Sequence, residues 1–551
     1  MNPSNEPTLG ERARWERDAH GFPLQSSRPR QTQLVQLQQA FSLALEASAS
    51  SSGLAPDWVT GAVALRLVLV SGRDLEDIYA LRLAPKAARA NPDWPTPILV
   101  ELEGHVPALW LKAGVSPHKG GSQGFSNHAG KQSDGVWFSL DQLSVALLRR
   151  ICSPTRHDIL NDVAKWPQLF SYREISGLQA AVDAFRENAA AQLGFDPTRS
   201  LPDVGTCKLF LQRQLATSMP ADPAISWLVT DTEPKRNATK SYYSSLSLSD
   251  ADRYQCAAVN TLPPSPPAQM ATDSLRLTPP PVLGERVVGS RYRATDEAVK
   301  KLRDHLLKAT EKGRGTMTLE RQVAFDQAFT TYCWLFFSMH TGWRSPNELL
   351  PRAPDIDWQT GAFLIEDKRR VSGGQTADID DDDDDLEANP ATADSLQTAA
   401  CPATDQANVV LAASRRRWLP LGERVCEQVQ AYHQHLAGRK RLQTRSRRPL
   451  PISSLEDRKQ LRTYLRALPN LGWDLPMNFS RHYLRSGLIG RLGGDAIAAY
   501  LGHWEAGSEP WWNGSCLDPL AYTAQTQRAI SELLPKEEWP VIQGFPVPRG
   551  I

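Results

Sequence analysis

The chain has 551 residues, of which 41% are hydrophobic and 22% are charged. This length exceeds what one ordinary hydrophobic core holds, so we expect roughly three domains, and the composition excludes wholesale disorder. The longest apolar run, residues 63–70, is interrupted by Arg66 and falls far short of the roughly 20 residues that span a bilayer. We therefore expect no membrane partner, and the N-terminus, which lacks the apolar core of a secretory signal, predicts a cytoplasmic protein.

Charge is strongly segregated along the chain, although the net charge is only +1. Residues 378–387 contain seven Asp and one Glu, whereas residues 411–500 contain 17 Lys or Arg against six Asp or Glu, a balance of +11. A region with that balance can neutralise phosphates. The seven cysteines are scattered, with no close pair to begin a zinc site or a disulfide framework, so we expect reduced thiols.

The first 260 residues contain no catalytic motif. Their periodicity predicts helices at 34–45 and 174–193, and strands at 98–102 and 108–111. We infer only that one or two domains precede the rest of the chain.

Two stretches have the composition of unstructured segments. Residues 263–284 are rich in proline, which prevents regular helix, and we interpret them as a linker between domains. Residues 371–412 combine Gly373 and Gly374 with the acidic run and many Ala and Thr, so they cannot bury enough apolar surface to fold alone. We expect a disordered acidic insertion within a domain, most often a solvated tract; a role as a DNA mimic on the basic surface is the less favoured alternative.

Beyond the linker the pattern is mostly helical. Helices are predicted at 295–313, at 319–340, where the apolar end indicates a core helix, and from 425 to 436. Ser453 and Glu456 have the spacing of a capping box that opens a further helix. Short strands at 362–365 and 417–421 are predicted to pair across the acidic insertion.

Three cationic or basic residues of this half suit phosphate chemistry. Arg344 follows the core helix in the sequence Thr-Gly-Trp-Arg. Arg485 follows His482 by three residues, and this spacing places the side chains of His482 and Arg485 on one helix face. Arginine suits this role because its planar fork grips two phosphate oxygens.

A histidine and a tyrosine complete the set. In Leu-Gly-His, Gly502 can end the helix that begins at Asp495 and leave His503 at its mouth, and Tyr522 follows on the next helix. Phosphoryl transfer without a metal needs such a combination of cations, a nucleophile and a proton donor.

The order of these residues closely resembles the tyrosine recombinase family, the phage-type integrases, over about residues 293–530. The resemblance implies that Arg344 and Arg485 clamp the scissile phosphate and that Tyr522 attacks it. It implies that Lys368, near the turn of the hairpin, protonates the departing 5′ oxygen, and that His482 and His503 assist with proton transfer and phosphate contacts. The segments at 355–357 and 418–421 match the family's entry to and exit from that hairpin.

The resemblance also implies the domain plan and the partners. We expect a mainly α, multidomain protein with a small antiparallel sheet in an integrase-type catalytic domain at 285–551. Before it we expect an unassigned extension at 1–155 and a helical DNA-binding, core-binding-like domain at 156–262. Such an enzyme of a mobile genetic element acts on double-stranded DNA as a homo-oligomer, a tetramer on paired sites, in some cases with partner recombinases. It integrates or exchanges DNA through a 3′-phosphotyrosine and requires no cofactor and no metal.

Several assignments have structural alternatives. Tyr522 can form a hydrophobic staple with Leu517, because Asp518 and Pro519 are typical first residues of a helix. Lys368 competes with the neighbouring arginines at 369–370 and 415–417 for the proton-donor role. His433 and His435 do not predict a metal site, because residues two apart point to different faces of a helix.

Two rival functions remain open. A type IB topoisomerase shares the chemistry but relaxes one duplex instead of exchanging strands between two. A catalytically inactive descendant would only bind DNA, as a subunit of a mobile element; Asn347, where the family usually has a carboxylate, is compatible with that interpretation.

The charge balance of residues 411–500 generates a first prediction. DNA affinity should fall steeply as salt rises, because each neutralised phosphate releases counterions, with a slope of about −0.9 per phosphate contact in a plot of log K against log salt. Titration of a duplex by fluorescence anisotropy at several salt concentrations measures the slope. A flat response would show that this basic region does not carry the affinity.

Overall fold

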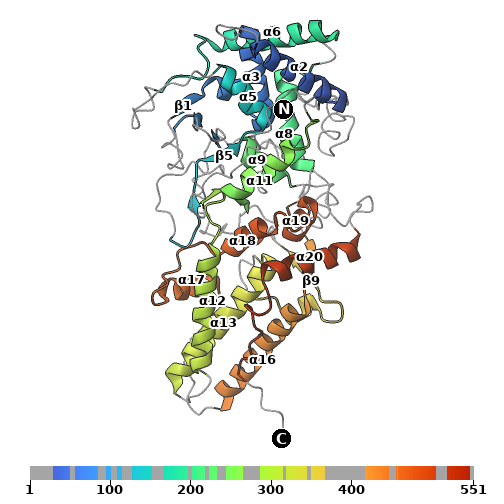
Figure 1. Ribbon diagram of the computed structural model, residues 1–551. Coiled ribbons are helices and arrows are strands. Elements are labelled where there is room, and N and C mark those ends of the chain that lie inside the picture. Colours follow the sequence, from blue (N-terminus) through green and yellow to red (C-terminus); the bar gives the residue numbers. More distant parts are fainter. Residues whose placement is uncertain are drawn as a thin grey trace, which may run out of the picture. The chain divides into compact units, whose positions relative to one another are not determined.

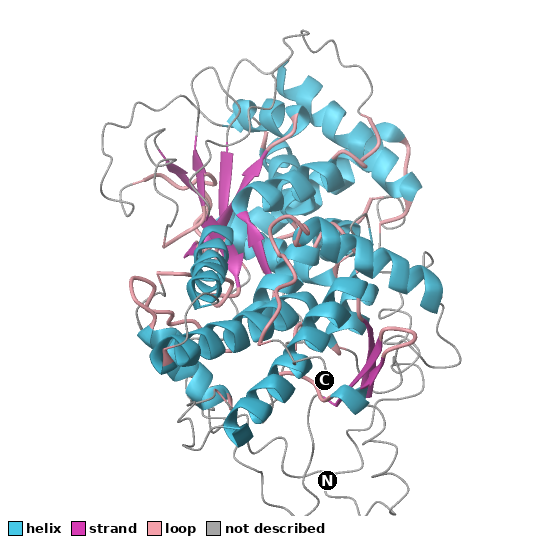
Figure 2. Cartoon of the chain, turned by 90° about the horizontal axis from the view of Figure 1, so that it is seen from below, coloured by secondary structure: helices cyan, strands magenta, loops and turns pink. Residues whose placement is uncertain are grey.

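A computed structural model describes residues 29–49, 56–84, 95–100, 108–113, 127–151, 166–196, 201–217, 222–231, 243–264, 286–313, 318–343, 349–366, 416–445, 455, 457–503 and 518–545. The chain is mostly helical, with its strands in small sheets (Figure 2). It divides into two compact units. Unit 1 comprises Met1–Ser116, Lys131–Lys235 and Leu246–Gly289, and unit 2 comprises Pro117–Gly130, Arg236–Ser245 and Ser290–Ile551. Of the linker predicted at 263–284, only residues 263 and 264 are described. The acidic insertion predicted at 371–412 lies wholly outside the described residues.

Unit 1 combines helices with a four-stranded sheet. Its helices are α2 (Gln31–Ala49), α3 (Asp57–Ser71), α4 (Leu75–Tyr79), α5 (Gln142–Ile151), α6 (Ile175–Leu193), α8 (Val204–Thr217), α9 (Pro223–Thr230) and α11 (Leu248–Val259). The sheet has the order β1-β2-β3-β5, formed by Arg82–Ala84, Ile98–Val100, Ala108–Lys112 and Gly135–Ser139. The first pair is parallel and the others are antiparallel. A second small sheet has the order β4-β7-β6, formed by Lys131–Gln132, Arg286–Gly289 and Ser245–Ser247.

Helix α3 is the central helix of unit 1 and corresponds to the apolar run of the sequence. It contacts α2, α5, α6 and α8. Arg66, which interrupts the run, is buried and forms an ion pair with Asp141, while its Nε donates to Ser144 Oγ at 3.1 Å. Burial of this charge is compensated by these partners. In the part of the chain that the structure describes, no helix is long and apolar enough to cross a membrane.

The boundary predicted near residue 155 lies inside unit 1. Helix α3, before it, and helix α6, after it, pack closely together. Gly61 permits this approach, because a Cβ there would lie 2.0 Å from the carbonyl oxygen of Ala181. The segments predicted as an N-terminal extension and as a helical domain therefore share one core, and the helical segment 156–262 contributes α6, α8, α9 and α11 to it.

Unit 2 is built on a helical core with one antiparallel sheet. Its helices are α12 (Asp296–Gly313), α13 (Leu319–Thr341), α16 (Glu423–Arg445), α17 (Arg458–Ala467), α18 (Phe479–Leu488), α19 (Gly494–Leu501) and α20 (Pro519–Leu533) (Figure 1). Its strands are β8 (Ile356–Asp357), β9 (Ala362–Glu366) and β10 (Arg416–Pro420). The predicted helices at 295–313 and 319–340 are confirmed as α12 and α13, and the helix predicted at 425–436 is the middle of α16.

Helix α13 is the core helix that its composition predicts. Every residue of 325–341 except Gln327 is buried, and the helix contacts α12, α16 and α18. A helix that is apolar on all sides needs neighbours on all sides. It ends at Gly342, whose φ of +62° is the left-handed conformation that glycine adopts without strain.

The predicted hairpin is also present. Strand β9 pairs antiparallel with β10, from Ala362 opposite Pro420 to Glu366 opposite Arg416, and β8 pairs with the other edge of β9. Residues 367–415 connect β9 to β10, so the acidic stretch is an insertion in this hairpin, as the sequence predicts.

Two helix starts can be compared with their predicted caps. Helix α20 is capped as predicted by Asp518, which accepts from the backbone N–H groups of Leu520 and Ala521, with Pro519 at the first position. Helix α17 is capped by Asp457, which accepts from Gln460 N–H at 2.8 Å. The capping box predicted at 453 and 456 lies outside the described residues.

The chain beyond α20 closes the core of unit 2. Trp539 is buried, and the hydroxyl of Tyr332 donates to the carbonyl of Pro540 at 2.6 Å. The side-chain amide of Gln428 both donates to the carbonyl of Ile542 and accepts from its N–H group. These bonds attach residues 539–542 to α13 and α16.

The buried His340 of α13 makes the stability of unit 2 sensitive to acid. Its ring stacks on Phe336 at 4.2 Å, and its Nδ1 lies 2.7 Å from the Phe336 carbonyl oxygen, to which it donates. Burial lowers the pKa of His340 from 6.5 to about 4. The unfolded chain therefore binds this proton more readily, and stability is lost as the pH falls from about 6.5 towards 4.

We expect that the His340→Asn variant loses part of this acid sensitivity, since Asn can donate to the same carbonyl but does not titrate. The difference corresponds to roughly 3 kcal/mol between pH 7 and pH 4, at about 1.36 kcal/mol per pKa unit. Urea unfolding of both proteins across this range measures it. Parallel pH profiles for the two proteins would show that folded His340 takes up its proton as readily as the unfolded chain, so that burial does not lower its pKa.

Candidate functional site

Helix α18 carries two of the predicted site residues in a buried position. His482 has no exposed surface and Arg485 is 1% exposed, and all other residues of this helix are buried as well. The Nδ1 atom of His482 lies 2.6 Å from the hydroxyl oxygen of Ser290. The same oxygen accepts a hydrogen bond from the N–H group of Tyr292. The predicted placement of His482 and Arg485 on one helix is confirmed, and Ser290 orients the imidazole.

His503 lies directly after α19. This helix ends at Gly502, whose φ is +71°, and the N–H group of His503 donates to the carbonyl of Ala498 at 2.8 Å. The predicted glycine cap is therefore correct. The side chain of His503 is buried next to α18, where Nε and Nη2 of Arg481 lie 3.3 and 3.0 Å from its Nε2 atom.

Tyr243 brings His482 and His503 into one cluster. Its ring lies 4.5 Å from the ring of His482 and 5.0 Å from the ring of His503, with an angle of 18° to the latter. The guanidinium of Arg481 lies over the Tyr243 ring at 5.2 Å. Both predicted histidines therefore share contacts with one aromatic ring that is distant from them in the sequence.

The segment that leads to Arg344 approaches the same helices. A Cβ on Gly342 would lie 2.8 Å from Cδ2 of Leu501, in α19, and 3.5 Å from Cδ2 of Leu484, in α18. The hydroxyl of Tyr500 donates to the carbonyl of His340 at 2.6 Å, which further joins α19 to the end of α13. Arg344 itself lies outside the described residues, two positions after Gly342 in the sequence.

Strand β9, which precedes Lys368 in the chain, packs on the same end of α13. Trp343 lies 5.3 Å from the ring of Phe363 in β9, and Phe337 lies 5.7 Å from the same ring. Lys368 is outside the described residues, two positions after the end of β9. The structure therefore positions the strand that leads to Lys368 but not its side chain.

Tyr522 lies in the first turns of α20 and is 1% exposed. Helix α20 contacts α18, α19 and β10, and these helices lie beside one another in Figure 1. At its far end a Cβ on Gly487 would lie 2.7 Å from Leu533, so α18 and α20 approach closely there. Leu517, the partner of Tyr522 in the alternative staple, lies outside the described residues.

Three residues of this cluster were not predicted from the sequence, namely Tyr243, Ser290 and Arg481. Arg481 adjoins His482 in the chain, so its presence in the motif was visible, but its direction towards His503 depends on how α18 and α19 pack. Tyr243 and Ser290 lie outside the stretch 293–530 that carries the resemblance, and local pattern contains no sign of their role.

His435, which lies near Cys426 in the sequence, has a structural role. It is buried with its Nε2 2.8 Å from Asp326 Oδ1, and its Nδ1 accepts from the N–H group of Phe545 at 3.1 Å. Arg439 lies 3.5 Å from the same carboxylate oxygen. Among the described residues no cluster of His, Cys, Asp and Glu could hold a metal ion.

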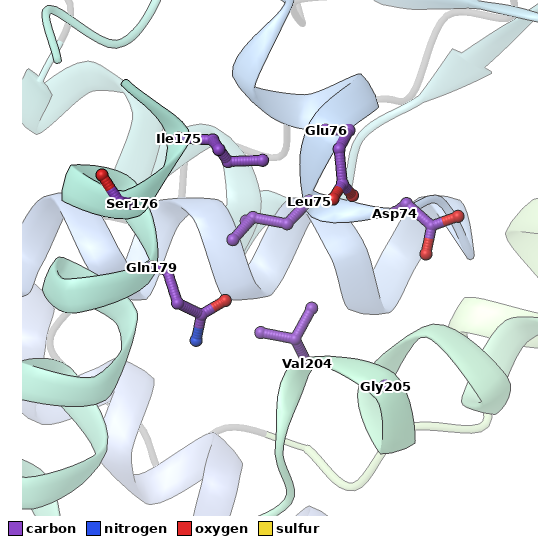
Figure 3. Close-up of a pocket in the computed structure, with 8 residues that line it drawn as sticks. All are labelled: Asp74, Leu75, Glu76, Ile175, Ser176, Gln179, Val204 and Gly205. Atoms are coloured by element: carbon purple, nitrogen blue, oxygen red, sulfur yellow. The ribbon is translucent and has the colours of Figure 1, made fainter. Parts of the chain in front are cut away.

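A pocket of about 410 Å³ lies in unit 1, between the starts of α4, α6 and α8 (Figure 3). Leu75, Ile175 and Val204 contribute apolar surface, and Glu76 and Gln179 contribute polar groups. None of the predicted site residues lines it, and its described lining includes two carboxylates and no cation. Such a lining does not suit a phosphate, because carboxylates repel it.

Comparisons of the chain with protein-family models, with curated proteins and with solved structures found no match.

Gly342 provides a test of this local packing. Alanine at position 342 would be destabilising for two reasons. A left-handed backbone costs a residue with a Cβ about 1 kcal/mol, and the Cβ would collide with Leu501. We expect Gly342→Ala to destabilise unit 2 by about 1–3 kcal/mol more than the backbone cost alone.

Gly472 supplies the matched control, because its φ is +53° and a Cβ added there would meet no described atom within 4 Å. Urea unfolding of Gly342→Ala and Gly472→Ala separates the two costs. Equal losses in the two variants would mean that α13 does not end against α19 as described.

Proposed function

We propose that the chain is a tyrosine recombinase that cleaves and rejoins DNA through a 3′-phosphotyrosine. The observation that supports this most is the meeting of α18, which carries His482 and Arg485, with the end of α19 and the end of α13. His482 and His503 also share contacts with the ring of Tyr243. These elements come from separate parts of the sequence, and a purely structural role for each motif does not require them to meet.

In the proposed reaction Arg344 and Arg485 hold the non-bridging oxygens of one phosphate, each through its planar fork. The hydroxyl of Tyr522 attacks the phosphorus and gives up its proton to His482. The bond to the 5′ oxygen breaks, and Lys368 supplies the proton to that leaving group. The tyrosyl phosphate keeps the energy of the broken bond, so a 5′ hydroxyl of another strand can displace the tyrosine and reseal the DNA. No cofactor takes part.

The charge of unit 2 is compatible with a DNA partner. Helix α17 buries Leu461 and Leu465 and exposes Lys459 and Arg466, so it presents cations to solvent on an amphipathic helix. Exposed cations of this kind contact phosphates independently of sequence. We propose double-stranded DNA as the substrate, bound by several copies of the chain on paired sites.

The decisive test concerns Tyr522. Phenylalanine keeps the ring and its packing, so Tyr522→Phe removes the hydroxyl and should abolish covalent attachment to DNA while DNA binding survives. The substrate is a pool of nicked duplexes that contains random sequences and the DNA flanking the gene of this chain. Covalent complexes are captured after denaturation in detergent and counted by radiolabel, and captured sequences identify the target site.

Tyr500 offers a matched control, since it is also a buried tyrosine of unit 2, with its hydroxyl bonded to a backbone carbonyl. Tyr500→Phe should lose about 0.5–1.5 kcal/mol of stability and keep covalent capture. Capture that persists in Tyr522→Phe would place the nucleophile elsewhere. Binding without capture by the unmodified protein would indicate a DNA-binding subunit, and relaxation of a single supercoiled plasmid without exchange between two marked sites would indicate a topoisomerase.

A further inference from the structure

Arg481 and Tyr243 surround His503 on two sides. Arg481 directs Nε and Nη2 at a single atom, Nε2 of His503, and Nη2 also donates to the carbonyl of Leu501. The Tyr243 ring lies nearly parallel to the imidazole, at 5.0 Å, and also beneath the guanidinium. All three side chains are buried. These contacts fix both the position and the plane of the His503 imidazole ring.

The chemistry of arginine decides which nitrogen of His503 carries the proton. A guanidinium has donors and no acceptor, and it stays charged at any pH relevant here. The Nε2 atom must therefore accept, so it carries no proton. A neutral imidazole has one proton, and in His503 that proton is on Nδ1.

We propose that Arg481 and Tyr243 are positioning residues that hold His503 as its Nδ1–H tautomer, so that His503 takes part in the reaction as a hydrogen-bond donor through Nδ1. The base role at Nε2 is closed to it, because that lone pair is occupied by Arg481. Of the two histidines, His482 then remains for proton transfer. The role in catalysis depends on the proposed function, whereas the tautomer does not.

The tautomer is measured on the protein alone. Ring ¹⁵N chemical shifts of protein labelled at its 11 histidines distinguish a protonated from an unprotonated nitrogen, and the signal that disappears in His503→Gln belongs to His503. We expect an unprotonated Nε2 and a protonated Nδ1. A protonated Nε2 in the unmodified protein overturns the proposal, whatever the protein does to DNA.

Variants of Arg481 test the cause. Arg481→Met keeps the aliphatic stem and removes every donor, so His503 should leave the pure Nδ1–H form, whereas Arg481→Lys keeps a donor and should preserve it. Arg491→Met is the matched control, because Arg491 donates to the carbonyl of Gly487 near the end of the same helix and has no described contact with His503. An unchanged tautomer in folded Arg481→Met would overturn the positioning role; if that variant does not fold, a changed tautomer in Arg481→Lys overturns it.

Substitutions of His503 test the consequence for cleavage. The amide nitrogen of asparagine can occupy the position of Nδ1, and that of glutamine the position of Nε2. We therefore expect both variants to capture DNA more slowly than the unmodified protein, and His503→Gln to be slower than His503→Asn by about 10²–10³-fold, the usual effect of removing one transition-state donor. Greater activity in His503→Gln than in His503→Asn would overturn the donor role. Absence of capture in the unmodified protein would instead contradict the proposed function and leave the tautomer to be decided by its ¹⁵N shifts.

Discussion

The complete burial of α13 is the constraint on which the rest of unit 2 depends. Its second half is apolar on every side, and a helix of that kind is stable only when neighbours cover all of its faces. Helices α12, α16 and α18 do so. Because α13 then stops abruptly at a left-handed glycine pressed against Leu501 and Leu484, the chain leaves the core beside the ends of α18 and α19. The burial of one helix thereby determines where the predicted site can form.

Helix α18 is unusual because it is buried and yet carries several polar side chains. This helix places Arg481, His482 and Arg485 in the interior, where a cation or an imidazole is costly unless hydrogen bonds satisfy it. Arg481 meets this requirement with a carbonyl oxygen, an imidazole nitrogen and the face of an aromatic ring. Ser290 serves His482 in the same way. A set of interior polar groups held by specific partners is rigid, and rigidity is what an arrangement for phosphate chemistry needs.

Much of this architecture could be predicted because it is local. The positions of α12, α13 and α19, the glycine cap at Gly502, the cap at Asp518 and the pairing of β9 with β10 all follow from apolar period, capping residues and alternation over a few residues. Unit 1 is less accessible to such prediction. Helix α3 is an apolar run with one interrupting arginine, and only its packing against α6 and the pairing of Arg66 with Asp141 show why that arginine is inside. No local sequence pattern could predict that α3, before the predicted boundary at 155, packs against α6, after it.

The sequence by itself determined the order of the motifs, the helix ends that present His503 and Tyr522, and the segregation of charge, because each depends on residues close together in the chain. Only the tertiary structure decided that Tyr243 and Ser290 join the cluster and that Arg481 turns towards His503. These contacts connect residues 22 to 260 positions apart, as between Arg481 and His503 or between Tyr243 and His503. The geometry of such pairs is set by how whole helices pack, and the sequence between the two residues contains no pattern that predicts their contact.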